Sequence, residues 1–219
     1  SALEIFPRDF DLALLHVRSL NELERYEESI RIMHDIQVLP SEHSLGAHQL
    51  FSDAEVMAGL VALERGELEV ANDHFFMAMT WPERLGQGRP YSPEERLPRF
   101  LLALSHWLSD DSEGASRAWT AVVDATPDSV FWGESATRLD LLGALSLEAL
   151  GRQEELKSFG DVGVGALAPV ANQVRAASRA GESVAFAVAA TTAEIDENFD
   201  DIQGRLIQKV LGFASQVVH

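Results

Sequence analysis

Four prolines recur at a nearly constant long interval along this 219-residue chain. Pro40, Pro82, Pro127 and Pro169 are separated by 42, 45 and 42 residues. A period of this length is typical of repeat proteins, in which each helix hairpin buries its apolar face against the next. The interval therefore predicts an array of about four similar units over residues 1–169.

The spacing of apolar residues predicts an almost entirely α-helical chain. Apolar residues recur three and four positions apart, and runs of β-branched residues are short. Short turns, with sequences such as "RGEL" and "DDSE", separate a first helix from a second in each unit. The expected helices span residues 9–23, 25–38, 47–65, 67–80, 93–108, 112–125, 134–150 and 152–159, and residues 170–219 are expected to add two or three capping helices in the same compact domain.

The second unit shows how such a hairpin packs. Gly59 lies in its first helix, Gly66 marks the turn, and Ala71, Phe75 and Ala78 follow along its second helix. Small residues allow two helix backbones to approach, and an aromatic ring then fills the seam between them. The third unit repeats this pattern with Ala103, Ala115, Trp119 and Pro127. The first unit matches it in part, with Tyr26, Ser29 and Met33.

This spacing resembles the tetratricopeptide repeat. Its period is about 34 residues, whereas HEAT-type repeats have about 40 to 47. Because the helix pairs keep tetratricopeptide spacing, we assign the excess length to loops at 40–47 and 81–92. The resemblance implies a right-handed superhelix of helix hairpins, an α-solenoid with long inter-repeat loops and a helical C-terminal cap.

A second resemblance involves the loop "WPERLGQGRPYSPEERL" and covers roughly residues 10–125. It is similar to the helical-repeat tail of large bacterial proteins that carry a β-rich domain of unknown function near sugar-utilisation genes. The matching residues are Trp81, Pro82, Glu83, Leu85, Gly86, Gly88, Pro90, Tyr91, Glu95, Arg96 and Leu97, with a fainter match at Phe186, Phe199, Asp200, Asp201, Gln203 and Arg205. With the "SA" start of the chain, this resemblance suggests a piece of a larger protein.

The charge of the chain excludes some partners. Its net charge is -18, from 35 acidic and 17 basic residues, so nucleic acid and anionic membrane surfaces are expected to be repelled. The longest uncharged run, residues 162–174, is too short and too interrupted to cross a bilayer. We expect a cytoplasmic protein without a bound cofactor.

Candidate chemical sites are weak. "GVGALA" at Gly163 fits a dinucleotide fingerprint, but the strand and βαβ unit that this motif needs are not predicted. His34, His43 and His48 lack the ligand spacing of a zinc site, and we expect His106 to be a packing residue. Neither a nucleophile elbow nor a recognisable nucleophile and base pair occurs, so we predict no catalytic residues and no metal site.

The resemblance to tetratricopeptide repeats implies a partner-binding groove lined by the first helix of each unit. Such concave faces bind peptide or protein segments in solenoids, and Trp107 is an expected anchor. An alternative is that the same apolar residues pack against another domain of a parent chain. The implied groove residues are Arg18, Asn21, Asp53, Phe100, Trp107 and Arg138, with Leu60, Leu104 and Leu145 also on this face.

The loop at 81–97 is expected to end one helix and start the next. Ser92 is a fitting N-cap, Pro93 suits the first helical position, and Glu95 would complete a capping box. Gly86 and Gly88 permit positive φ. Four further residues of the loop are not needed for a connection between two helices, and we regard them as candidates for contact with another domain. They are Trp81, Arg84, Arg89 and Tyr91.

The expected function is non-catalytic protein–protein or interdomain interaction. An accessory segment of a sugar-processing enzyme is the alternative, and a sensor arm of a transcription regulator is a weaker third. Residues 197–217 carry an apolar stripe, which fits a capping helix or a dimerisation helix. The expected partner is a protein or peptide segment, with another domain of the same chain or a second copy as further candidates.

Overall fold

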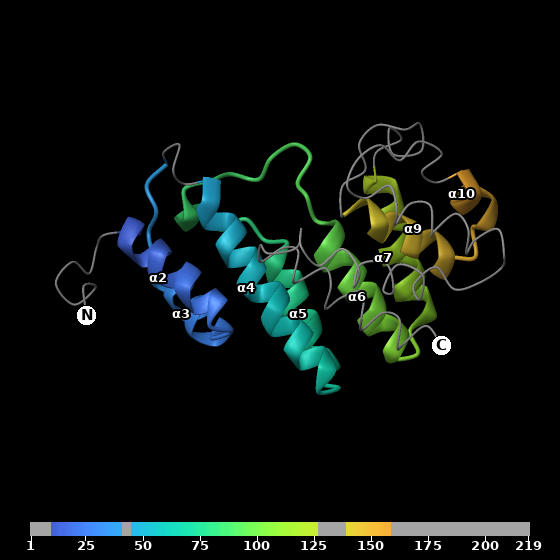
Figure 1. Cartoon of the computed structure of the whole chain (residues 1–219), viewed down its shortest axis with the longest axis horizontal. Helices are drawn as coiled ribbons and strands as arrows, with labels where there is room; N and C mark the ends of the chain where they lie inside the picture. The colour runs from blue at the N-terminus through green and yellow to red at the C-terminus, as the bar shows by residue number, and fades with distance from the viewer. Residues whose placement is uncertain (1–9, 41–44, 127–138, 159–219) are drawn as a thin grey trace. The chain divides into compact units, whose positions relative to one another are not determined.

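The computed structural model describes residues 10–40, 45–126 and 139–158, and all regular elements in these ranges are helical (Figure 1). This confirms the all-α prediction for the described part of the chain. The helices are α2 (Phe10–Glu22), α3 (Tyr26–Asp35), α4 (Leu45–Glu64), α5 (Leu68–Ala78), the 3-10 helix η2 (Glu83–Leu85), α6 (Arg96–Leu108), α7 (Ser112–Ala125), α9 (Asp140–Ala149) and α10 (Gln153–Ser158).

The α-helices pack as sequential pairs, which are α2 with α3, α4 with α5, α6 with α7 and α9 with α10. The chain divides into two compact units. Unit 1, residues 1–94, holds the first two hairpins and η2, and unit 2, residues 95–219, holds the other two.

All four hairpins turn with the same backbone geometry. Each first helix is followed by one residue in the left-handed region: Glu24, Gly66, Asp110 or Gly151, with φ of 58°, 75°, 59° and 68°. The next residue donates its N–H to a carbonyl five positions back, at 2.9 Å in every hairpin. This bond pattern is the Schellman motif, which satisfies carbonyls at a helix end. The turns recur after 42, 44 and 41 residues, so the long period seen in the prolines is also present in the backbone.

A buried residue follows each turn at the same position. The fifth residue after the left-handed one is fully buried in all four hairpins: Ser29, Ala71, Ala115 and Leu156. The predicted close approach of the two helices in the second hairpin is also present. A Cβ built on Gly59 would lie 2.6 Å from a ring carbon of Phe75, so only glycine fits at this crossing of α4 and α5.

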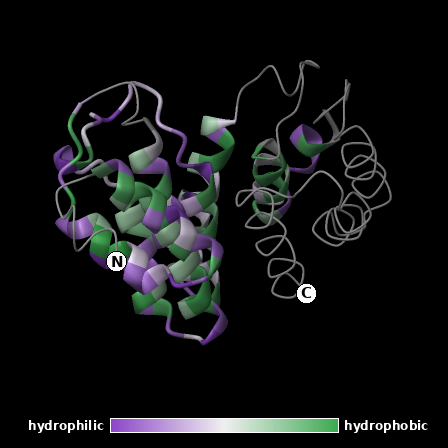
Figure 2. Ribbon diagram, turned by 60° about the vertical axis from the view of Figure 1, so that its left-hand side comes forward, coloured by the Kyte–Doolittle hydropathy of each residue, from purple (hydrophilic) through white to green (hydrophobic). Residues whose placement is uncertain are grey.

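The core of unit 1 joins both of its hairpins to the segments that follow them. Val17 of α2, Met33 of α3 and Phe51 of α4 are fully buried together with Val38 and with Leu85 of η2. Green and purple residues alternate along the helices in Figure 2, as expected for helices with one buried face. The segment that follows α3 and the 3-10 helix η2 therefore complete this core.

The segment after α3 follows a different path from the predicted one. The sequence predicts helix to residue 38, but α3 ends at Asp35 and Ile36 is extended, with ψ of 143°. The N–H of Val38 donates to the carbonyl of Arg84 at 2.8 Å. Gly86 lies against this segment with φ of 71°, and a Cβ there would lie 2.9 Å from the Val38 carbonyl oxygen. A long-range contact thus ends the helix early.

The predicted start of α6 is wrong. The helix begins at Arg96 rather than Pro93, and its N-cap residue, Glu95, makes no capping hydrogen bond through its side chain. Pro98 gives the physical reason. A proline has no N–H to donate, so it is tolerated in the first turn but would break the hydrogen bonding of a helix that began at Pro93. Gly88, unlike Gly86, does not have positive φ.

Three predictions concern residues beyond the described ranges. The capping helices after residue 170 and the apolar stripe at 197–217 lie outside them, as does the start of the helix predicted at 134. Within the described ranges, no helix is long and apolar enough to cross a membrane.

Candidate functional site

The predicted groove residues of unit 1 differ in accessibility. Asn21 and Asp53 are buried, with 5% and 7% of their surface exposed, whereas Arg18 is exposed. The side-chain amide of Asn21 donates to the carbonyl of Leu50 at 3.1 Å, which joins α2 to α4. Asp53 accepts a hydrogen bond from Gln49 at 2.8 Å. Of these three, only Arg18 is exposed to solvent.

The predicted groove residues of unit 2 show the same division. Phe100 is 2% exposed, whereas Trp107 is 46% exposed on α6. The Trp107 ring lies 5.9 Å from the buried ring of Trp119, centroid to centroid, so α7 supports one side of it. Arg138 lies outside the described residues. Trp107 is therefore the accessible aromatic side chain of the predicted set, as an anchor must be.

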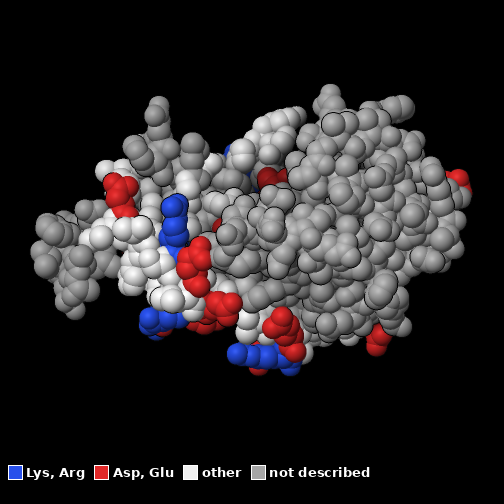
Figure 3. All heavy atoms as spheres, viewed as in Figure 1, with Lys and Arg blue, Asp and Glu red and all other residues white. Residues whose placement is uncertain are grey.

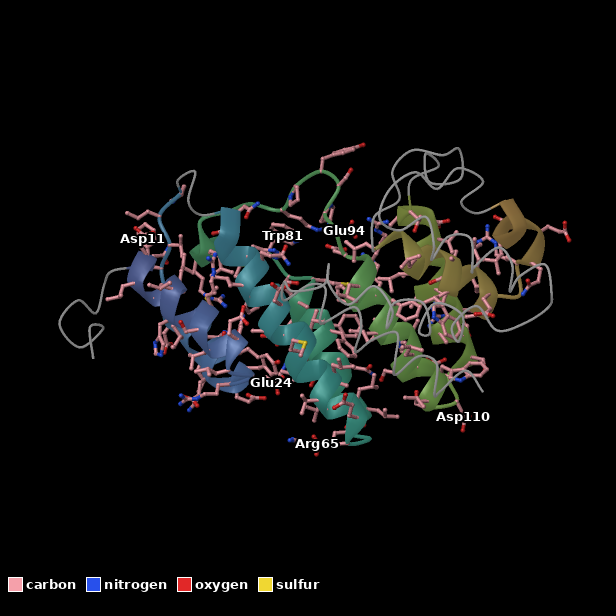
Figure 4. All side chains as sticks on the ribbon, in the orientation of Figure 1. Asp11, Glu24, Arg65, Trp81, Glu94 and Asp110 are labelled. Carbon is pink, nitrogen blue, oxygen red and sulfur yellow. The ribbon has the colours of Figure 1, made fainter. Side chains whose placement is uncertain are left out.

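Trp81, one of the four unexplained loop residues, packs inside unit 1. Its indole stacks on His48 of α4, with ring centroids 3.4 Å apart and planes within 4°. His48 in turn donates from Nε2 to the carbonyl of Thr80 at 2.9 Å. Trp81 lies at the opposite end of unit 1 from Glu24 and Arg65 (Figure 4). Its contacts within the unit give it a structural role in fastening the loop to α4.

Arg84 also binds within unit 1. Its Nε donates to the Met33 carbonyl at 3.0 Å and an Nη donates to Nδ1 of His34 at 3.3 Å. Its guanidinium carbon lies 5.8 Å from the centroid of the Phe51 ring, within the range of a cation–π contact. Arg89 and Tyr91 differ from these two, since both are exposed.

A pocket of about 220 Å³ opens in unit 1, at the end where the α2/α3 turn lies beside α4 and α5. Glu24 and Arg65 mark this end of the helices in Figure 4. The sequence did not indicate this pocket. Its charged lining residues are Glu24, Arg25, Glu27, Glu28, Arg65, Glu67 and His74, and its other lining residues are Tyr26, Ala58, Val61, Ala62 and Val70.

One side of this pocket contains a buried carboxylate paired with a histidine. Nδ1 of His74 on α5 lies 2.7 Å from Oε2 of Glu55 on α4, and the Glu55 side chain is only 2% exposed. Nε2 of His74 lies 3.8 Å from a carboxylate oxygen of Glu27 on α3. The hydrogen bond to Glu55 is the largest cause of a raised His74 pKa, against the opposing effect of burial, and the charges of Glu55, Glu27 and Asp73 add to it. When it is protonated, His74 links three helices through charge.

The close crossing of α4 and α5 brings the Glu55–His74 pair together. A Cβ on Gly59 would lie 3.0 Å from the Cβ of His74, the residue before Phe75. Glu55 is one helical turn before Gly59 on α4. The glycine and aromatic pattern, together with the polar residues next to the seam, is the sequence signal for this pair.

The remaining pocket charges leave an excess of carboxylates. Arg25 donates to both carboxylate oxygens of Glu28, at 2.7 and 2.5 Å, and His74 is balanced by Glu55. Arg65, Glu24, Glu27 and Glu67 also line the pocket. The lining of this acidic pocket thus holds four glutamates against two arginines and one histidine, together with apolar residues.

Residues able to hold a metal ion do not gather in groups of three or more anywhere in the described ranges. Comparison of the chain with protein-family models, curated protein sequences and solved structures found no match.

Proposed function

We propose that the chain is a non-catalytic recognition module that binds a protein or peptide segment. Its hairpins would be tetratricopeptide-like repeats that continue as a right-handed superhelix. The observation that carries this proposal is the recurrence of one hairpin geometry at Glu24, Gly66, Asp110 and Gly151. Stacked hairpins of this kind present extended surfaces that are characteristically used for binding.

The accessible side chains support a recognition role. Trp107, 46% exposed, is supported on one side by a buried tryptophan, and Leu108 beside it is 39% exposed. Large aromatic side chains of this kind are enriched among the residues that dominate protein–protein binding energies. Arg18 on α2 and Tyr91 on the loop are also exposed. These residues are the candidates for direct contact with a partner.

The size of the unit 1 pocket fits recognition better than the binding of a whole substrate. At about 220 Å³, it is smaller than the roughly 300 to 1,000 Å³ of typical ligand sites. One side chain of a partner would occupy such a recess. The pocket thus supports a binding role for the surface that surrounds it.

Selection from a random 12-residue peptide display library on the intact chain tests this proposal. We expect enriched peptides whose affinity falls at least tenfold in Trp107→Ala, because this substitution removes an aromatic anchor. The matched control is Phe76→Ala, which removes an aromatic ring with a similar exposed fraction of 53% from α5. Thermal unfolding of both variants shows whether the fold is retained. Failure to enrich any peptide, or equal affinities for wild type and both variants, would contradict the proposal.

A further inference from the structure

The acidic pocket of unit 1 is lined by both glutamates and apolar side chains. Ala58, Val61 and Ala62 of α4 and Val70 of α5 supply apolar lining. Glu27 and Glu67 also line the pocket, and both residues are exposed. Lysine and arginine side chains combine a hydrocarbon stem with a cationic head, and they bury the stem while the head stays near water or an anion.

We propose that this pocket binds a single lysine or arginine side chain of a partner peptide. The stem would lie against Ala58, Val61 and Val70, and the cationic head would lie between Glu27 and Glu67. This inference rests on the proposed function and names the chemistry of the partner. It also makes a basic segment, rather than an acidic or apolar one, the preferred ligand.

The balance of charges around the pocket favours a cation over an anion. Arg25, Arg65 and His74 line the pocket together with four glutamates. Arg25 and His74 already have carboxylate partners at 2.5 to 2.7 Å, so an anionic ligand would have to displace Glu28 or the buried Glu55, or bind at Arg65 beside the lining glutamates. The carboxylate of Glu27 is 76% exposed, so a cationic head could reach it from solvent while His74 Nε2 stays 3.8 Å from it.

The net charge of the whole chain also favours a basic ligand. At -18, it attracts basic segments over distances of about 10 Å at 0.1 M ionic strength. Acidic and basic side chains gather along the lower edge of the face in Figure 3, where the turn ends of α3 and α5 lie in Figure 1. A basic peptide would thus be drawn to a surface that already offers a recess for one of its side chains.

Titration of the intact 15N-labelled chain with acetyl-Ala-Lys-Ala-amide tests this inference. We expect amide shifts at Glu27 of α3, Ala62 of α4, Val70 of α5 and Glu67, the N-cap residue of α5, all of which line the pocket. The double variant Glu27→Gln, Glu67→Gln should weaken binding about threefold or more, the order expected for exposed ion pairs. Glu69→Gln, at an exposed α5 residue outside the pocket lining, should leave it unchanged.

Two comparison peptides distinguish the alternatives. Acetyl-Ala-norleucine-Ala-amide has the stem without the charge, and acetyl-Ala-Glu-Ala-amide has the opposite charge. Equal shifts with either peptide, no shifts with the lysine peptide, or equal affinity in the double variant would each overturn the inference. The library selection tests a different statement. If it enriches peptides that need no basic residue, the chain would still be a recognition module, but lysine or arginine would not be the occupant of this pocket.

Discussion

At single residues, the four turns show that glycine and residues with a side chain occupy the same left-handed backbone conformation. Gly66 and Gly151 have positive φ, which glycine adopts without steric cost. Glu24 and Asp110 have nearly the same φ but carry a Cβ, and this conformation costs roughly 1 to 2 kcal/mol for an ordinary residue. The first and third hairpins therefore keep the turn at a local energetic cost.

Substitutions at these turns have opposite expected signs. Gly66→Ala should destabilise the fold by about 1 kcal/mol, because space around its Cβ is open and only the positive φ opposes a side chain. Asp110→Gly should stabilise it by up to about 1 kcal/mol for the converse reason. Urea unfolding measures both.

The control for these substitutions is Gly46→Ala. Gly46 also has open space around its Cβ, but it lies in the first turn of α4 without positive φ. Alanine should be neutral or stabilising there by up to about 1 kcal/mol. If Gly66→Ala and Gly46→Ala had the same effect, the left-handed turn would not be the cause.

At the scale of elements, His74 links three helices through charge. It lies on α5, Glu55 faces it from α4 and Glu27 from α3, and Asp73 adds to the field from α5 itself. Because the His74 pKa is raised in the fold, protonation stabilises the folded state. This contribution is full below the unfolded pKa of about 6.5 and is lost as pH rises through the higher folded pKa.

The pH dependence of stability tests this link. The difference in unfolding free energy between wild type and His74→Asn should be largest near pH 6 and should shrink as pH rises above the folded pKa of His74. The comparison removes the contributions of groups that titrate equally in both proteins. His34→Asn serves as a second reference on α3, at a histidine outside the pocket. A difference that stays constant from pH 6 to pH 9 would show that the charge of His74 does not join these helices.

The helices were predictable from the sequence because local signals define them. The turns at Gly66 and Gly151 were marked by glycine, and the seam of α4 and α5 by Gly59 and Phe75. Contacts between distant segments were not predictable. The bond from Val38 to Arg84 shortens α3, and the pocket exists only because the α2/α3 turn lies beside α4 and α5.

One local error had a different cause. The residues at Ser92 have the spacing of a capping box, but the missing N–H of Pro98 restricts the helix start more strongly. The candidate site was predictable only in part. Trp107 is accessible as an anchor must be, whereas Asn21, Asp53 and Phe100 are buried, because helix periodicity alone does not distinguish a groove-facing residue from a core residue.

For the whole molecule, we propose that the hairpins themselves form the surface that recognises a partner. The recurring turns, the exposed Trp107 and the acidic pocket of unit 1 support this claim. Regular repeats, rather than a single catalytic cleft, would then set the length of segment that is bound.

Hydrogen–deuterium exchange of the intact chain, with and without the library peptide that binds it most tightly, can test whether the hairpins form the recognition surface. Bound peptide should slow exchange in the hairpins that it contacts, such as those that carry the pocket or the one that carries Trp107, because contact with a partner reduces local opening. Slowed exchange confined to residues 159–219, with no change in α2 to α7, would contradict the claim.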